Sequence, residues 1–475
     1  MSEERREPGA GADAASAAPL DSSPLTEGAV AAAISSVLVV GGGIAGLVVA
    51  RDLALAGLTV TVLEATDHLG GKVARHIVAG LELDAGAESF ATRRGIVAET
   101  ARQLGLHSRI VQPNPDGAWL QNRAGVAFPL PKTGILGIPG MPLAADVIRA
   151  IGLGAAVRAQ LDGLLFGFLA ANERNLGRLV RRRMGRRVLE QLVAPVTLGI
   201  HSKHPNDLDV DVVAPGLRAA MLRTGSLAHA VRQLRRAAPA GSAVNGISGG
   251  VYELVVAFER DLERFGVDVR LSSPVHGVDA AGVTLSDGSR IEADRVVVAT
   301  SLTSFGERNS AISEVNSAAE PVPNGAESEL STIVLVTLVV HNAQLDVAPR
   351  GTGLLVAPGS PGVRAKALTH ATAKWNWLAE TAGPGAHVLR LSYNDVSRDG
   401  LREQARVDAG VLLNVDIRPA DIVGFAVVEW RPPAGEPASI PGVVFVGEGV
   451  AGTGLAAVIS HAHSTAAGLL GGVVG

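Results

Sequence analysis

The chain of 475 residues contains no cysteine. This absence excludes disulfide bonds, thiolate metal sites and cysteine nucleophiles, and it fits a reducing compartment. Positive charge is not in excess either, because the formal net charge is −4, and nucleic-acid binding gains no electrostatic support. No repeat of fixed period is present. Apolar residues are plentiful, at 47%, and about 150 residues per domain predicts two or three domains.

No targeting segment is expected either. Residues 28–50 carry no charge and have the length of a membrane span, but three consecutive glycines and two serines interrupt them, and a strand followed by a helix explains them better. The opening MSEERREP does not have the positively charged start of a signal peptide. We therefore expect a cytoplasmic protein with a disordered tail at residues 1–34, which are rich in Ala, Ser, Gly and Pro.

The first ordered pattern is a strand, a helix and a second strand. Val37–Val40 is a β-branched run, Ile44–Leu55 has helical spacing, and Thr59–Leu63 is again β-branched and ends at Glu64. This order is typical of the first βαβ unit of a doubly wound parallel sheet.

A glycine motif joins the first strand to the helix. Gly41, Gly43 and Gly46 form G-x-G-x-x-G, in which the first glycine permits the tight turn and the second lets the backbone approach a pyrophosphate. The third lets the helix pack closely, with its N-terminus facing the phosphates. Glu64 is placed to bind the ribose hydroxyls, which favours FAD or NAD over NADP.

Two later segments favour FAD over NAD. LGGKV at residues 69–73 supplies a second glycine pair, and VFVGEG at 444–449 supplies a second strand and glycine turn. An enzyme that uses only a nicotinamide cofactor needs neither segment. We therefore expect a bound FAD.

The middle of the chain, about 105–240, is predicted to be mostly helical. In the run GRLVRRRMGRRVLEQLV at 177–193, the five arginines from Arg181 to Arg187 fall mainly on one face. We interpret this face as solvated, with a site for an anionic ligand as the alternative. The opposite, apolar stripe consists of Leu179, Val180, Met184, Val188 and Leu189.

Strand patterns return after residue 245. A hairpin is predicted around Asp287-Gly288, followed by a buried strand at Val296–Ala299. Further strands are predicted at 331–340 and 387–393, with a mobile polar loop at 304–330. The last segment, from about 442 to 470, predicts strand, glycine turn and helix.

Histidines do not predict a metal site. His201 and His204 have no third ligand nearby in sequence and are interpreted as loop residues. His461 and His463 lie on different faces of the last predicted helix and are interpreted as structural or exposed. No catalytic triad is apparent.

Taken together, the motifs of the chain resemble those of the oxygen-dependent protoporphyrinogen and coproporphyrinogen III oxidases. These enzymes are flavoproteins of haem synthesis within the amine-oxidase-like group. The proline-rich run, the arginine helix and the AKW segment are the more specific signals, and together the motifs span about 36–470 in the order of the actinobacterial members. In chain order they are VVGGGIAGL, LGGKV, LDAGAESFATR, VAFPLPKTGILGIPG, RLVRRRMGRRVLEQLVAPVTLGI, ALTHATAKWNWLAE and VVFVGEGVAGTGL.

The resemblance implies an α/β fold: a Rossmann-like FAD-binding domain of the amine-oxidase and glutathione-reductase type, an α+β substrate domain and a mostly helical inserted domain. The implied division is a tail at 1–34, FAD-binding parts at 35–100, 241–300 and 431–475, a helical substrate-binding insertion at 101–240, and a substrate-binding sheet domain at 301–430.

The resemblance also implies the site. Arg93 is expected to bind substrate propionates, with a plain surface arginine as the alternative, and no side chain is assigned to catalysis or to a metal. The residues expected at FAD are Gly41, Gly42, Gly43, Ile44, Ala45, Gly46, Glu64, Ala65, Gly71, Lys72, Gly86, Ala87, Glu88, Ser89, Val275, Trp430, Glu448, Thr453, Gly454 and Leu455.

The implied reaction is the oxidation of coproporphyrinogen III to coproporphyrin III in three two-electron steps, with O2 as acceptor and H2O2 as product. Such chemistry needs positioning and exclusion of water more than an acid–base pair. The expected partners are the porphyrinogen and O2, and not nucleic acid; a weak membrane association and hand-over to a ferrochelatase are left open.

Three alternatives stay open: a protoporphyrinogen IX oxidase, a diverged flavin amine or polyene oxidase, and a non-catalytic FAD- or porphyrin-binding relative. Two departures from the family pattern are present, and the first of them makes the non-catalytic alternative plausible. The segment after Trp430 is shortened to RPPAGEPASI, and LGIHSKHP replaces a Gly-Val-Tyr-Ala-Gly-Asp pattern.

Overall fold

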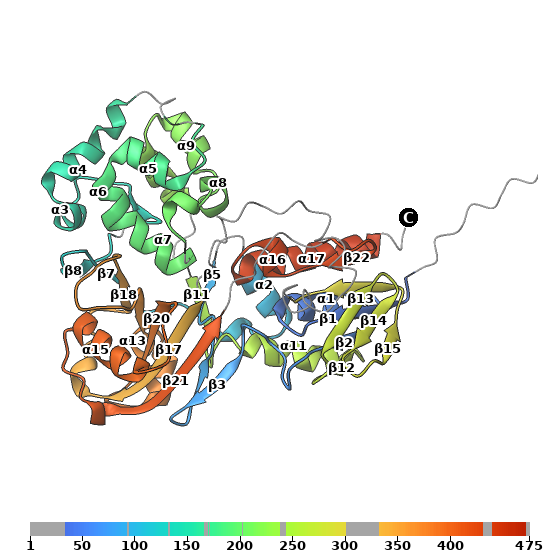
Figure 1. Cartoon of the computed structure of the whole chain (residues 1–475). Coiled ribbons are helices and arrows are strands. Elements are labelled where there is room, and N and C mark those ends of the chain that lie inside the picture. The colour runs from blue at the N-terminus through green and yellow to red at the C-terminus, as the bar shows by residue number, and fades with distance from the viewer. Residues whose placement is uncertain are drawn as a thin grey trace, which may run out of the picture.

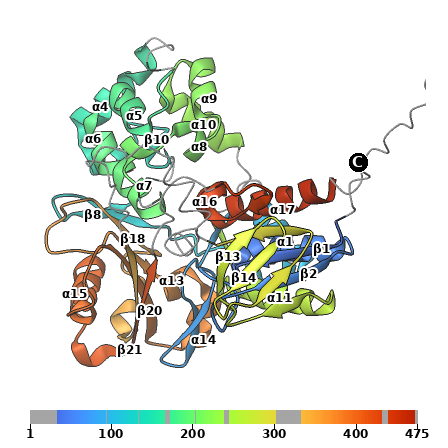
Figure 2. The same ribbon diagram turned by 45° about the vertical axis from the view of Figure 1, so that its right-hand side comes forward.

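The computed structural model describes residues 34–92, 95–131, 134–165, 170, 172–201, 203–237, 244–300, 332–430 and 439–471. The two largest sheets lie side by side. The helices from the middle of the chain form a lobe above the seven-stranded sheet in these views (Figures 1 and 2). The predicted tail at 1–34, apart from residue 34, lies outside the described residues. So does the predicted loop at 304–330.

The first sheet is parallel and has five strands in the order β12-β2-β1-β16-β22. It confirms the predicted strand, helix and strand, with α1 at Ile44–Leu55 joining β1 to β2. The strands are β1 Ser36–Val40, β2 Thr59–Leu63, β12 Asp268–Arg270, β16 Arg295–Val298 and β22 Val443–Phe445.

Successive side chains of β1 point to opposite faces of the sheet, and both faces are buried. Val37 and Val39 pack against α1, α11 (Glu253–Arg264) and α17 (Leu455–Gly471). Leu38 and Val40 pack toward a three-stranded meander on the other face. Both faces of a parallel sheet are normally covered in this way.

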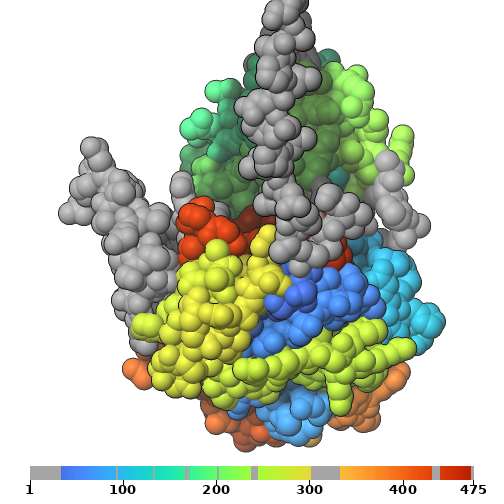
Figure 3. All heavy atoms as spheres, turned by 90° about the vertical axis from the view of Figure 1, so that its right-hand side faces the viewer, coloured from blue at the N-terminus to red at the C-terminus, as the bar shows by residue number. Residues whose placement is uncertain are grey.

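The predicted hairpin around Asp287-Gly288 is confirmed as β14 and β15 of this meander. The meander and α11 both lie on the face of the molecule that Figure 3 shows. Its strands are β13 Val275–Asp279, β14 Gly282–Leu285 and β15 Arg290–Glu292.

The second sheet has seven strands in the order β21-β17-β20-β19-β18-β7-β8. The strands predicted at 331–340 and 387–393 are confirmed as β17 and β20, which pair antiparallel. Strands β7 and β8 come from the segment expected in the helical insertion, yet β7 pairs with β18. The strands are β7 Trp119–Gln121, β8 Ala127–Pro129, β17 Ile333–His341, β18 Gly353–Val356, β19 Ala367–His370, β20 Ala386–Asn394 and β21 Ile422–Trp430.

The two faces of this sheet have different covers. Helix α15 (Leu401–Leu413) packs on one face. The other face carries the short helices α13 (Ala371–Lys374) and α14 (Asn376–Ala382) and the hairpin β3 (Arg75–Val78) and β4 (Leu81–Asp84). This second face therefore contacts a hairpin that follows directly from the parallel sheet.

The middle of the chain folds into the predicted helical lobe around its own core. Every residue of the predicted apolar stripe is buried. The helices are α3 Ala145–Ile151, α4 Leu153–Gln160, α5 Leu176–Met184, α6 Arg186–Val188, α7 Ala194–His201, α8 Val210–Val213, α9 Leu217–Thr224 and α10 Leu227–Ala237. Among the described residues, no helix is both long and apolar enough to cross a membrane.

One arginine departs from the solvated face expected for the run at 177–193. Arg181, Arg182, Arg186 and Arg187 are exposed, but Arg183 has a fully buried side chain whose Nε lies 2.5 Å from Asp162 Oδ1. Its guanidinium also donates to the carbonyl of Gly225 at 2.7 Å. The apolar stripe is wide enough to include position 183, so this cation is buried and needs a carboxylate partner.

Asp162→Asn would leave the Arg183 charge buried without its counter-ion. Breaking a buried ion pair from one side costs about 3–5 kcal/mol, so we expect urea unfolding to show a loss of that order. Glu190→Gln removes the partner of the exposed Arg186 and serves as the control, with no measurable change. Equal, small effects of the two variants would contradict the prediction.

Candidate functional site

Two glycines in and after the turn that follows β1 lie where a side chain would be strained or would collide with the backbone. Gly41 has φ +105°, a conformation that side chains disfavour. A Cβ on Gly46 would lie 2.0 Å from the carbonyl oxygen of Gly41. The first and third glycines thus have the packing roles that the motif predicts, and α1 starts directly at the edge of the sheet.

Gly43 is different, because a Cβ there would meet no atom within 4 Å. It is the N-cap of α1, makes no side-chain cap bond, and precedes a first turn without acidic residues. The first N–H groups of a helix have no partner within the helix and favour an anion. Their open surroundings here fit a pyrophosphate.

Glu64 braces this turn. Its Oε2 accepts from the N–H of Gly42 at 2.7 Å, while Oε1 accepts from the N–H and hydroxyl of Thr66 at 2.9 and 2.8 Å. Carboxylate oxygens can each accept further bonds, so the predicted ribose contact is compatible with this bracing. The N–H of Ser273 donates to the carbonyl of Glu64 at 2.8 Å, which brings the start of β13, with Val275, to the same edge.

The second glycine pair lies against the first motif. The N–H of Gly70 donates to the carbonyl of Gly42 at 2.8 Å. A Cβ on Gly71 would lie 3.5 Å from the Cα of Gly43. Lys72 then forms an ion pair with Glu448 of the C-terminal segment.

The C-terminal segment closes the same edge. A Cβ on Gly447 would lie 3.7 Å from the Cβ of Ala45, so the turn after β22 lies beside the start of α1. Thr453 and Gly454 are exposed, and Leu455 begins α17. Segments from opposite ends of the chain thus converge on one edge of the parallel sheet (Figure 1).

The loop after β4 is wedged between this edge and the second sheet. A Cβ on Gly86 would lie 2.0 Å from the carbonyl oxygen of Lys72 and 3.2 Å from Cζ2 of Trp430. Trp430 is the last residue of β21. The predicted residues Lys72, Gly86 and Trp430 are therefore neighbours.

Glu88 lies in the same loop and faces the second sheet. Lys374 Nζ donates to its Oε1 at 2.7 Å, and Arg390 Nη1 donates to its Oε2 at 3.0 Å. Burial alone would raise the pKa of Glu88, but these two cations outweigh burial and hold the pKa at about 2. Its predicted role at the cofactor stays a prediction.

Asp84 fixes the start of the loop. Its carboxylate accepts from the N–H groups of Val251 and Tyr252 at 3.0 and 2.9 Å. Burial raises the pKa of Asp84 to about 6, although both bonds oppose the rise. His76, on the paired strand β3, has its pKa lowered to about 4 by burial and by the charge of Arg390.

Several of these residues were not predicted. Arg390 and Lys374 reach Glu88 from 302 and 286 residues along the chain. The sequence feature that could have pointed to Arg390 is that it is a lone charge within an apolar strand. For Lys374, it is its place in the AKW segment. Arg93, the predicted substrate residue, lies outside the described residues, and so does the shortened segment after Trp430.

Two of the four histidines considered in the sequence have structural partners. The Nδ1 of His204 accepts from the N–H of Asn206 at 3.2 Å. His463 lies 2.5 Å from Asp52 and 3.2 Å from the hydroxyl of Thr100, and so joins α17 to α1 and α2 (Ile96–Gln103).

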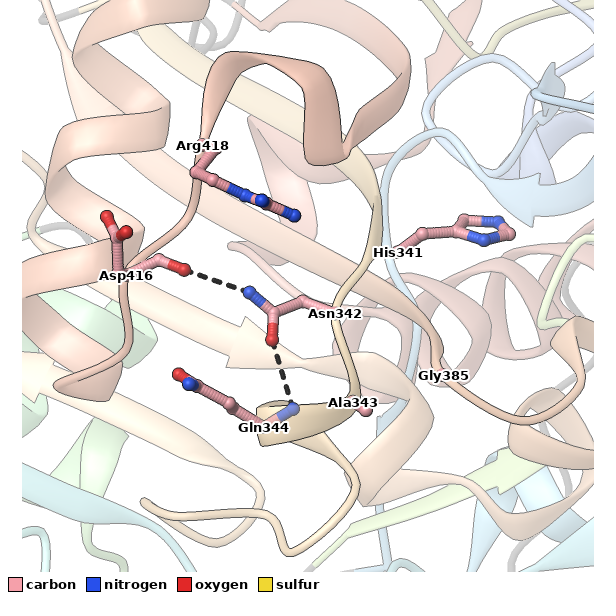
Figure 4. Close-up of a pocket in the computed structure, with 7 residues that line it drawn as sticks. All are labelled: His341, Asn342, Ala343, Gln344, Gly385, Asp416 and Arg418. Atoms are coloured by element: carbon pink, nitrogen blue, oxygen red, sulfur yellow. Dashed lines mark hydrogen bonds between the residues drawn. The ribbon is translucent and has the colours of Figure 1, made fainter.

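A separate pocket of about 540 Å³ lies at the end of β17. Asn342 occupies its centre, where it donates to the carbonyl of Asp416 at 2.9 Å and accepts from the N–H of Gln344 at 3.0 Å (Figure 4). These are local turn contacts, and no predicted site residue lines this pocket. The candidate site is therefore the edge of the parallel sheet.

Comparison with known proteins agrees with this geometry. The model of the family described as flavin containing amine oxidoreductase matches residues 44–324. The chain belongs to this family. It is a flavoprotein, and FAD is its cofactor. The FAD contacts predicted for the glycine turns at the sheet edge stay a prediction.

Named relatives narrow the comparison. A coproporphyrinogen III oxidase of Propionibacterium freudenreichii is 27% identical over 392 residues, which cover 75% of this chain and 72% of the relative. One of Mycobacterium bovis is 26% identical over 409 residues, which cover 82% and 84%. The crystal structure of a putative protoporphyrinogen oxidase from Exiguobacterium sp. 255-15 superposes with a TM-score of 0.73 at 23% identity, covering 92% of this chain and 98% of that one.

Gly43→Val should separate folding from cofactor binding. The open space around Gly43 accepts the side chain in the folded protein, but the isopropyl group then occupies the position of a pyrophosphate. We expect near-normal circular dichroism and loss of the flavin that the wild type releases on denaturation.

Gly46→Val is the control, because its Cβ would collide with the carbonyl oxygen of Gly41; it should lose folded protein as well as flavin. A Gly43→Val protein that retains one flavin per chain would show that this turn does not bind the phosphates.

Asp84 and His76 predict opposing pH effects on stability. With its pKa raised from 3.8 to about 6, folded Asp84 keeps a proton that the unfolded chain has lost, so its contribution to stability falls as pH rises through this window. With its pKa lowered from 6.5 to about 4, His76 contributes stability that is lost as pH falls through that window.

Asp84→Asn removes the first effect and leaves the second. We expect the free energy of unfolding of the variant to rise more steeply between about pH 4 and 6, by about 2–3 kcal/mol relative to wild type. Urea unfolding at a series of pH values measures this difference. Parallel profiles would contradict the assigned titration.

Proposed function

We propose that the protein is an FAD-dependent oxidase that converts coproporphyrinogen III to coproporphyrin III, with O2 as acceptor and H2O2 as product. The observation that carries this proposal is the match to proteins of that name over most of both chains. The site geometry supports the cofactor half of the proposal, because the glycine cradle fits a dinucleotide. As part of the proposal, the enzyme acts in the cytoplasm on a soluble tetracarboxylate.

The chain's contribution to this reaction is position and exclusion of water. When bound, FAD would supply the two-electron oxidation chemistry, with oxygen as the proposed final acceptor. The glycine turn at Gly41–Gly46 would hold its pyrophosphate, while the loop with Gly86 and the end of β21 with Trp430 bring the second sheet to the same place. Removal of hydrogen from an electron-rich porphyrinogen needs no acid–base pair if the substrate is held in place.

Neither tyrosine is available to line an amine pocket. Tyr252 donates to Glu82 at 3.0 Å, and Tyr393, fully buried, donates to Asp408 at 3.0 Å. They are the two tyrosines of the sequence. An aromatic pocket for an amine would therefore have to be built from Trp or Phe.

Anaerobic mixing of the purified flavoprotein with each porphyrinogen tests the proposal. We expect coproporphyrinogen III to bleach the flavin faster than protoporphyrinogen IX, and air to restore the yellow colour with formation of peroxide. Faster bleaching by protoporphyrinogen would reassign the substrate. Bleaching by neither would favour a carrier role.

Arg93→Ala tests the predicted propionate contact. A charge-assisted contact contributes about 1.5–3 kcal/mol, so its loss should raise KM for coproporphyrinogen about ten- to a hundred-fold without changing the flavin content. Arg186→Ala is the matched control, since Arg186 is exposed and pairs with Glu190. An unchanged kcat/KM in Arg93→Ala would show that Arg93 is an ordinary surface residue.

A further inference from the structure

The carboxylate of Glu88 joins the two sheets of the molecule. Glu88 follows β4, which leads from the parallel sheet, while Lys374 ends α13 and Arg390 lies within β20 of the second sheet. The side chains of Glu88 and Lys374 are each 16% exposed, and that of Arg390 is 9% exposed. These three charges therefore meet where little water reaches them, and each depends on the others for compensation.

Arg390 holds the loop at a second point. While Nη1 binds Glu88, Nη2 donates to the carbonyl of Gly86 at 2.7 Å. The two contacts lie two residues apart on one loop and come from one planar guanidinium. Such a fork fixes both the position and the orientation of its target.

The loop that is held in this way has little freedom on its other side. Gly86 lies against the carbonyl oxygen of Lys72 and the ring of Trp430. Lys72 in turn pairs with Glu448 at the start of α16 (Glu448–Ala451). A shift of Glu88 would therefore displace the backbone on which the segments around the cofactor site converge.

We propose that Glu88 is a positioning residue: its contacts with Lys374 and Arg390 hold residues 85–89 in the geometry that binds the flavin, and they couple cofactor binding to the seating of the second sheet. The proposal rests on the flavin site and on the predicted place of this loop within it. It is independent of which porphyrinogen is oxidised.

Glu88→Gln keeps the shape of the side chain and removes its charge. We expect the Kd for FAD, measured by titration of the apoprotein, to rise at least tenfold, and the visible circular dichroism of bound FAD to change. Glu88→Asp, which keeps the charge, should restore part of the affinity. Arg390→Lys keeps a cation but cannot reach both Glu88 and the Gly86 carbonyl, so it should weaken FAD binding in the same direction.

Asp162→Asn is the matched control. It also breaks a buried ion pair, but in the helical lobe, so it should lower the melting temperature and leave the Kd and spectrum of FAD unchanged. If Glu88→Gln lowers the melting temperature similarly and binds FAD as the wild type does, the ion pair is merely structural and the proposal is wrong.

If Glu88→Gln does not fold, Glu88→Asp and Arg390→Lys decide by the same FAD titration: wild-type affinity in both overturns the proposal. All of these measurements use FAD alone. Failure of the coproporphyrinogen assignment would leave them unaffected, so the two results are distinguishable.

Discussion

The close contact between Gly46 and Gly41 is the constraint on which the site depends. A Cβ on Gly46 would lie only 2.0 Å from the carbonyl oxygen of Gly41. Any other residue at position 46 would therefore push α1 away from the end of β1. Because α1 stays close, its unpartnered N–H groups lie at the edge where the parallel strands end, and Gly43 leaves the space before them open. The second glycine pair, the C-terminal turn and the loop after β4 then pack around this fixed point. Ligands of open parallel sheets bind at this edge because the strand ends and helix starts meet there.

Buried charged groups help to fix the two sheets relative to each other. The apolar clusters explain why each sheet and the helical lobe fold, but they are largely separate from one another. Between the two sheets the contacts include Glu88 with its two cations, and Asp84 on the N–H groups at the start of α11. Charged and hydrogen-bonded contacts are more directional than apolar packing. They therefore select one relative orientation of the two sheets, which hydrophobic burial alone would specify less strictly.

Sequence patterns predicted the parts of this molecule whose signals are local. The βαβ unit at its N-terminal end, the hairpin at Asp287-Gly288 and the strands β17 and β20 all follow from periodicity and turn residues within a short window. What could not be predicted needs tertiary contact. Arg183 looks like its exposed neighbours until Asp162 is brought beside it, and β7 and β8 are too short to show that they join β18. Lys374 and Arg390 were recognisable only as a motif and a lone charge, because their partner is about 300 residues away.

The site's dispersal along the chain has a consequence for its energetics. Its predicted cofactor residues run from Gly41 to Leu455, so no short segment can bind FAD in the unfolded chain. A ligand that binds only the folded state adds stability that grows with its concentration over Kd. Three ion pairs lie here: Lys72 with Glu448, and Glu88 with Lys374 and with Arg390. They join residues that are 376, 286 and 302 positions apart. FAD bound at the predicted site would add to the long-range contacts that these charges make, and its binding would then stabilise the arrangement of the two sheets.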